Sequence, residues 1–318
     1  MKAILFSVSL AWFWCACCLA DEPGQLRLLV LCGHPGDAEF RQRFADSVEQ
    51  LATGLESQWG FDRRYMTVLF GGADMETDGG PYPQAATGPC TLTRVRETVA
   101  AVGAELQPDD RIWVVLGGHA LFDGRDVWWN LPETDPNQDE LAELFARWNC
   151  RQTVYFITTP ASGLLARPLS RPGRVVICAT EASAELQAPY YLEELAKVVA
   201  GPIEPDAADL DGDGQFSLLD LYLLISRTVS QRYLDEQFII TEHAQLDDNG
   251  DGRFTEVQRR FFPRELDGVR REGQPTPTIA AGGDGDRARQ ILLTPRLNTR
   301  DADLDRPPSP QLPTAPVN

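Results

Sequence analysis

Short apolar runs recur along the first part of the chain, and each is followed by Gly, Pro or a polar turn. We expect a strand in each run, because a strand that is covered on both faces of a sheet has few polar positions. The expected strands are residues 26–33, 65–71, 112–118, 153–159 and 174–180.

Amphipathic segments separate these runs and predict helices over residues 38–57, from Thr93 to Gly103 or the 107–110 turn, from near Pro136, and over 190–200. Alternating strands and helices predict an α/β fold whose mainly parallel sheet has helices on both faces. Ligands of such sheets gather at the carboxyl ends of the strands. His34, His119 and residues 158–163 all follow such ends, so we expect one site there.

The net charge of -18 bears on which partners the protein can bind. No run of basic residues accompanies it, so we expect no nucleic-acid partner. Part of the acidity is concentrated in two short Asp-rich stretches, which indicates cation binding.

The first residues predict a signal peptide over 1–20, with an apolar stretch from Ala3 to Trp14 and cleavage after Ala20. We therefore expect an exported, secreted or periplasmic protein without a permanent membrane span. Four cysteines remain after cleavage, and both disulfides and buried free thiols are open to them. They are Cys32, Cys90, Cys150 and Cys178.

Residues 209–220, DLDGDGQFSLLD, match the twelve-residue calcium loop. A hard cation needs six or seven oxygens that converge from one short segment, and alternate positions of this loop supply them. Gly214 permits the bend and Phe216 is the expected apolar anchor between paired loops. The expected ligands are Asp209, Asp211, Asp213, Gln215, Ser217 and Asp220.

Residues 247–258, DDNGDGRFTEVQ, repeat the pattern 38 residues later, which predicts an EF-hand-like pair. Helices are expected after the first loop and over 233–241 before the second. Gln258 stands where a bidentate carboxylate is usual, so we expect the second loop to bind calcium more weakly. The expected ligands are Asp247, Asn249, Asp251, Arg253, Thr255 and Gln258.

Four segments resemble the caspase and legumain-like cysteine peptidases: DDRIWVVLGGHALFDG (109–124), VWWNLPETDPNQDELAELF (127–145), VYFITTPASG (154–163) and GRVVICATEASAE (173–185). The similarity is closest to bacterial legumain-like proteins that lack the catalytic Cys and continue into a calcium-loop segment, here AADLDGDGQFSLLDLY and TEHAQLDDNGDG. The resemblance implies a caspase-like sheet with a catalytic His, at His119, after one strand and a Cys after the next.

The nucleophile position departs from the family. Alignment of Ser162 and Gly163 with the small residues after the nucleophile places Pro160 where the Cys belongs. A cysteine peptidase attacks through a thiolate with His as proton acceptor, and proline cannot do this. One alternative is a noncanonical hydrolase that uses Ser162 with His119. Another is a peptide-binding module at the former cleft.

These patterns predict four parts: a signal peptide (1–20), a caspase/legumain-like α/β domain (21–203), an EF-hand-like calcium pair (204–264) and a disordered Pro/Arg/Asp-rich tail (265–318). The expected function is that of an exported Ca²⁺-binding protein with a non-proteolytic domain. We expect this domain to bind or scaffold a peptide or protein at the strand ends.

Overall fold

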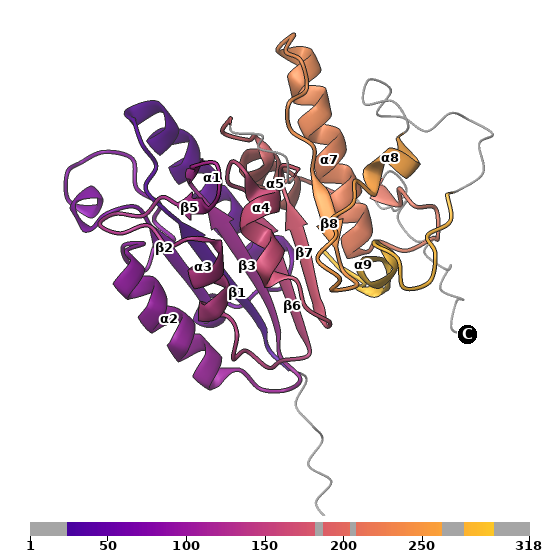
Figure 1. Cartoon of the computed structure of the whole chain (residues 1–318), viewed down its shortest axis with the longest axis horizontal. Helices are drawn as coiled ribbons and strands as arrows, with labels where there is room; N and C mark the ends of the chain where they lie inside the picture. The colour runs from indigo at the N-terminus through magenta and orange to yellow at the C-terminus, as the bar shows by residue number, and fades with distance from the viewer. Residues whose placement is uncertain (1–23, 182–186, 204–207, 263–276, 296–318) are drawn as a thin grey trace, which may run out of the picture.

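The computed structural model describes residues 24–181, 187–203, 208–262 and 277–295. Its centre is a six-stranded sheet in the order β2-β1-β3-β6-β7-β8 (Figure 1). The first five strands of this order are parallel, and β8 is antiparallel to β7. The strands are β1 (Leu26–Cys32), β2 (Met66–Phe70), β3 (Arg111–Gly117), β6 (Gln152–Ile157), β7 (Arg174–Cys178) and β8 (Gln245–Asp247).

Outside this sheet, β4 (Ala120–Phe122) and β5 (Val127–Trp129) form a small antiparallel hairpin after His119. The α-helices are α1 (Ala38–Gln58), α2 (Leu92–Glu105), α3 (Gln138–Leu144), α4 (Ser162–Ala166), α5 (Tyr191–Ala200), α7 (Leu218–Asp235), α8 (Gln258–Phe261) and α9 (Asp286–Gln290). Short 3-10 helices are η1 (Arg63–Tyr65), η2 (Ala73–Glu76) and η3 (Arg167–Leu169). The mixed α/β class and the mostly parallel sheet are therefore confirmed.

Two apolar cores cover the two faces of the sheet, which explains why its strands are apolar at nearly every position. In β1, Leu28 and Val30 belong to the core that includes α1, α5 and α7, whereas Leu29 and Leu31 belong to the core of α2, α3 and α4. Successive side chains of a strand point to opposite faces, so both sets are buried.

Charged groups bind three helices of the first core together. Glu193 on α5 forms ion pairs with Arg43 of α1 and Arg232 of α7. The Arg232 guanidinium also lies 3.8 Å from the centroid of the Tyr190 ring. Both arginines are largely covered, so these pairs are better shielded from water than ordinary surface pairs.

The segment before the second Asp-rich loop is a strand, and the helix expected over 233–241 is wrong. Helix α7 ends at Asp235, and Gln237 follows with a φ of 59° in the left-handed region. Phe238 and Ile239 are then exposed, by 58% and 86%. The chain next forms β8, which covers the outer edge of β7 and thereby shares the main sheet.

The expected disordered tail over 265–318 does not hold for residues 277–295, and its other residues lie outside the described ones. Residues 277–295 are ordered and carry α9, and Ile279 and Ala288 are buried in the first core. Helices α7, α8 and α9 gather at the β8 end of the sheet, on the side opposite α2 (Figure 1). Since α7, β8 and α9 share this core and sheet, the expected boundary near residue 204 does not separate two cores.

The expected signal peptide, residues 1–20, lies outside the described residues. No helix in the part of the chain that the structure describes is long and apolar enough to cross a membrane.

Gly285 allows the C-terminal segment to pack, and its replacement tests that packing. Its φ is 95°, and an added Cβ would lie 2.8 Å from Ile279 Cδ1. We expect Gly285→Ala to release residues 277–295 and to increase their amide hydrogen exchange. Gly282→Ala is the matched control, because its φ is 72° but open space surrounds the added Cβ. This control should cost only the backbone strain, about 1 kcal/mol. Equal exchange in both variants would contradict the packing role.

Candidate functional site

His119 follows β3 and is held against the loop after β1. Its Nε2 lies 2.9 Å from the carbonyl oxygen of Pro35. A carbonyl only accepts, so this contact places the proton on Nε2. The rings of Phe40 and Phe44 pack against the imidazole with edge geometry, at centroid distances of 4.7 and 5.4 Å. These contacts fix the ring in one orientation.

The surroundings of His119 favour its neutral form. Burial lowers the pKa of this imidazole, while the Pro35 carbonyl and Asp37 raise it and thereby offset part of that shift. The net shift is downward, so the ring is uncharged at pH 7 and can accept through Nδ1. A proton acceptor therefore exists at the strand end.

Ser162 does not meet this acceptor in the described structure. Its side chain is 0% exposed, and its Oγ lies 2.9 Å from Thr180 Oγ1 and accepts from the Thr180 backbone N–H. The Ser162 N–H in turn donates to Thr180 Oγ1. This reciprocal pair ties the start of α4 to the end of β7, which gives Ser162 a structural role rather than that of an open nucleophile.

The turn before Ser162 offers no thiol. Pro160 is buried at the expected nucleophile position, and Ala161 has a φ of 51°, which directs the chain into α4. Cysteines elsewhere do not substitute for it: all four described cysteines are free, and Cys150 is the one that is not fully buried. Burial raises the pKa of Cys32 and Cys90 well above the ordinary value for a thiol.

The first Asp-rich loop is wound around the carboxylate of Asp209. Asp209 Oδ1 accepts from the N–H groups of Gly212 and Asp213, and Oδ2 accepts from that of Gly214. Gly212 and Gly214 have φ values of 76° and 83°, a region that side chains rarely enter. The loop therefore curls tightly enough to bring alternate side chains together.

Three carboxylates meet inside this loop. Asp209, Asp211 and Asp213 each offer an oxygen within 4.8 Å of the others. Asp211 is only 4% exposed, and its Oδ2 has no hydrogen-bond partner among the described residues. Burial, followed by the nearby charges of Asp220 and Asp213, raises the pKa of Asp211 to about 6. A buried carboxylate oxygen without a donor is the kind of group that a divalent cation neutralises.

Asp220 and Ser217 support the loop through hydrogen bonds to its backbone. Asp220 Oδ1 accepts from the N–H groups of Leu210 and Asp211, and Oδ2 accepts from the N–H and Oγ of Ser217. Ser217 also caps α7, with Asp220 completing the capping box. The three-carboxylate cluster does not include Asp220, and Gln215 is exposed beside that cluster.

The second loop has the same backbone conformation. Gly250 and Gly252 have φ values of 78° and 73° and donate to the two oxygens of Asp247. Asp251 N–H donates to Asn249 Oδ1, as Asp213 N–H does to Asp211 Oδ1 in the first loop. Asp251 and Arg253 are exposed, whereas Asp247 is buried and receives a further hydrogen bond from Ser170 Oγ.

Two details of the expected pair are wrong. Gln258 does not close the second loop: its Nε2 donates to the Ala244 carbonyl, and its Oε1 accepts from the Tyr222 hydroxyl. The loops also do not pair through Phe216, whose carbonyl accepts from Leu293 N–H and whose ring packs against Trp59. Thr255 of the second loop instead forms an antiparallel β-bridge with Leu246, which immediately precedes that loop.

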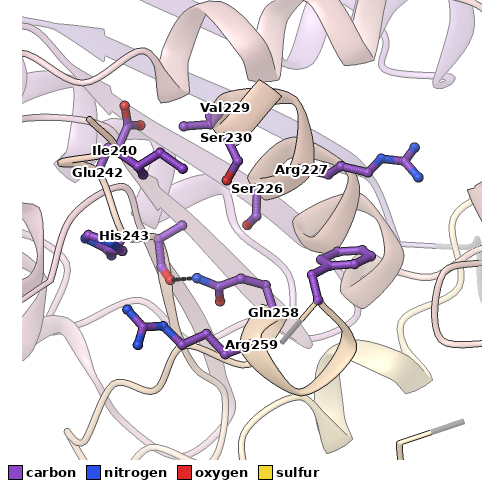
Figure 2. Close-up of a pocket in the computed structure, with 11 residues that line it drawn as sticks. Ser226, Arg227, Val229, Ser230, Ile240, Glu242, His243, Gln258 and Arg259 are labelled. Atoms are coloured by element: carbon purple, nitrogen blue, oxygen red, sulfur yellow. Dashed lines mark hydrogen bonds between the residues drawn. The ribbon is translucent and has the colours of Figure 1, made fainter. Parts of the chain in front are cut away.

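The close-up in Figure 2 shows the surroundings of Gln258. Its amide points toward residues 240–244 across a small pocket between α7 and α8. His243 lines this pocket, while His119 and Ser162 do not. The pocket is thus separate from the strand-end residues.

Sequence reasoning missed several partners that only appear in space. Thr180 holds Ser162, Pro35 holds His119, and Ser170 and Asp284 contact the second loop. The only sequence signal for Asp284 is its place in GGDGD, which resembles the Asp-Gly spacing of the loops.

No family model matches the chain, and no curated protein matches it either. Among solved structures, protein GSU0716 from Geobacter sulfurreducens aligns with 70% of this chain and 92% of its own, at 14% sequence identity and a TM-score of 0.40.

The effect of the three-carboxylate cluster on the free energy of unfolding can be measured without any cation. A carboxyl with a raised folded-state pKa destabilises the fold as pH rises from about 4 through 6, because its charged form is favoured in the unfolded chain. In a chelator at pH 8, we expect Asp211→Asn to unfold with a free energy roughly 1–3 kcal/mol higher than wild type. This difference should vanish near pH 4 in denaturant titrations. A variant that is less stable at pH 8 would contradict the buried-charge interpretation.

Proposed function

We propose that this chain is an exported calcium-binding protein whose α/β domain is a caspase/legumain-like scaffold without thiol-dependent proteolysis. The observation that carries the calcium assignment is the buried Asp211 oxygen, which lies without a donor beside Asp209 and Asp213. Hard oxygen ligands at alternate positions of a glycine-bent loop suit Ca²⁺ better than softer metals.

The strand order supports the scaffold part of the proposal. Five parallel strands followed by an antiparallel edge strand place the end of β3, with His119, next to the end of β6, with Pro160. That is where the resemblance to the caspase and legumain-like peptidases expects the catalytic His and Cys. Since Pro160 stands where the resemblance expects the Cys, the neutral imidazole has no sulfur at that position to activate, and we assign a binding or scaffolding role to this edge.

The alternative, a hydrolase that uses Ser162 with His119, requires Ser162 to leave its hydrogen bonds with Thr180 and to become exposed. No described contact joins the two side chains. We therefore favour a peptide or protein partner at the strand ends over a reaction there.

Calorimetric titration with calcium tests the cation site. We expect Asp213→Asn to weaken the first loop by about tenfold or more, because it removes one of three carboxylates. The wild-type Kd should lie near 0.1–1 mM, as in extracellular modules. Asp235→Asn is the matched control, because this exposed Asp lies at the far end of α7. Identical titrations of all three proteins would refute the assignment.

Peptide hydrolysis tests the scaffold proposal. Wild type and His119→Ala should both cleave a broad peptide library only at background rate, because none of the described contacts of the imidazole is with a nucleophile. An electrophilic peptide probe should likewise leave every side chain unlabelled. Cleavage by wild type that His119→Ala abolishes would establish an enzyme instead, and a mapped covalent adduct would identify its nucleophile.

A further inference from the structure

We infer that the second calcium site is assembled from two separate segments, with Asp284 of the C-terminal segment as its closing carboxylate. This inference rests on the proposed calcium function and extends it to a residue outside both twelve-residue loops. It follows from the contact of Asp284 with the second loop, from its burial, and from the orientation of Gln258.

Asp284 contacts the second loop as Asp220 contacts the first. In the first loop, Asp220 accepts from the backbone N–H of Leu210, at loop position 2, and from the hydroxyl of Ser217, at position 9. In the second loop, Asp284 Oδ2 accepts from the hydroxyl of Thr255, at position 9, over 2.8 Å. Position 9 therefore supplies a hydroxyl to a carboxylate in both loops.

The residue that should close the second loop is directed elsewhere. Gln258 stands at position 12, but both ends of its amide are engaged by Ala244 and Tyr222, outside the loop. The side chains at positions 1, 3 and 5 of the loop therefore provide two carboxylates and one amide, from Asp247, Asp251 and Asn249. Asp284 would add a third carboxylate, although the oxygens of Asp247, Asp251 and Asp284 do not form a close group like that of Asp209, Asp211 and Asp213 in the described structure.

One oxygen of Asp284 is available for a ligand. Asp284 is 5% exposed, and its Oδ1 is buried without a hydrogen-bond partner among the described residues. The charges of Asp247 and Asp248 lie close enough to act on this carboxylate. A buried carboxylate oxygen among other carboxylates is unfavourable unless a cation compensates it. In the first loop, Asp211 Oδ2 is likewise buried without a hydrogen-bond partner among the described residues.

Asp248 holds Asp284 in this position. Its two carboxylate oxygens accept from the N–H groups of Gly285 and Ala288, at the start of α9, over 3.0 and 2.7 Å. The adjacent residues Asp247 and Asp248 thus have different tasks: the first organises the loop, and the second docks the segment that carries Asp284. Asp248 is a positioning residue, because its oxygens are used by α9.

The test is a calcium titration of the full chain by calorimetry, for wild type, Asp209→Asn, Asp284→Asn and the control Asp286→Asn. Asp286 begins α9 two residues after Asp284, but its carboxylate accepts from Gly282 N–H and lies beside Arg289. We expect wild type and the control to show two binding events. Asp284→Asn should weaken by about tenfold or more the event that Asp209→Asn leaves intact.

Two results would overturn the inference while the calcium function stands. One is a pair of events with unchanged affinities in Asp284→Asn. The other is a single wild-type event that Asp209→Asn removes. Absence of any calcium binding in wild type would instead refute the proposed function itself. Thermal melting in chelator establishes whether Asp284→Asn folds. If it does not, Asp248→Asn replaces it, and an unchanged second event in that variant would also overturn the inference.

Discussion

Buried carboxylates shape the two Asp-rich loops and attach the C-terminal segment to the second of them. Asp220, Asp247, Asp248 and Asp284 are each at most 5% exposed, and each accepts hydrogen bonds from loop backbone or hydroxyl groups. Few apolar residues lie within these loops, so hydrogen bonds to carboxylates determine their shape. The same charges repel one another in low dielectric, which makes their neutralisation by a cation favourable.

The strand-end edge obeys a different constraint, which is close packing. An added Cβ at Gly117 would be 3.1 Å from Leu192 Cδ2 and 3.5 Å from Cys32 Sγ, so a side chain at the end of β3 would require Leu192 to shift. His119 is the first residue that can project beyond this packed layer, and Pro35, Phe40 and Phe44 then fix it. The result is an oriented, neutral imidazole at the strand ends, while Ser162 is hydrogen-bonded to Thr180.

The C-terminal segment connects the two loops that the sequence places 38 residues apart. Leu293 pairs with Phe216 of the first loop, while Asp284 and the start of α9 contact the second. In an EF-hand pair, one loop would support the other directly. Here residues 284–293 provide that support, and β8 joins the second loop to the main sheet. The two Asp-rich loops and the α/β core therefore form one packed body in the described residues.

Local patterns in the sequence determined the strands, the main helices and both loop conformations. Apolar runs covered on both faces, helical spacing, and Gly at loop positions 4 and 6 depend on near neighbours in the chain, so the five parallel strands and the Asp209, Asp211 and Asp213 cluster were predictable. The tertiary structure alone decided the pairing of β8 with β7, the hydrogen bonds of Ser162 with Thr180, and the contacts of Gln258 and Asp284. Each depends on groups far apart in sequence, such as Thr180 for Ser162 and Tyr222 for Gln258, and no local pattern records which of them will meet when the cores pack.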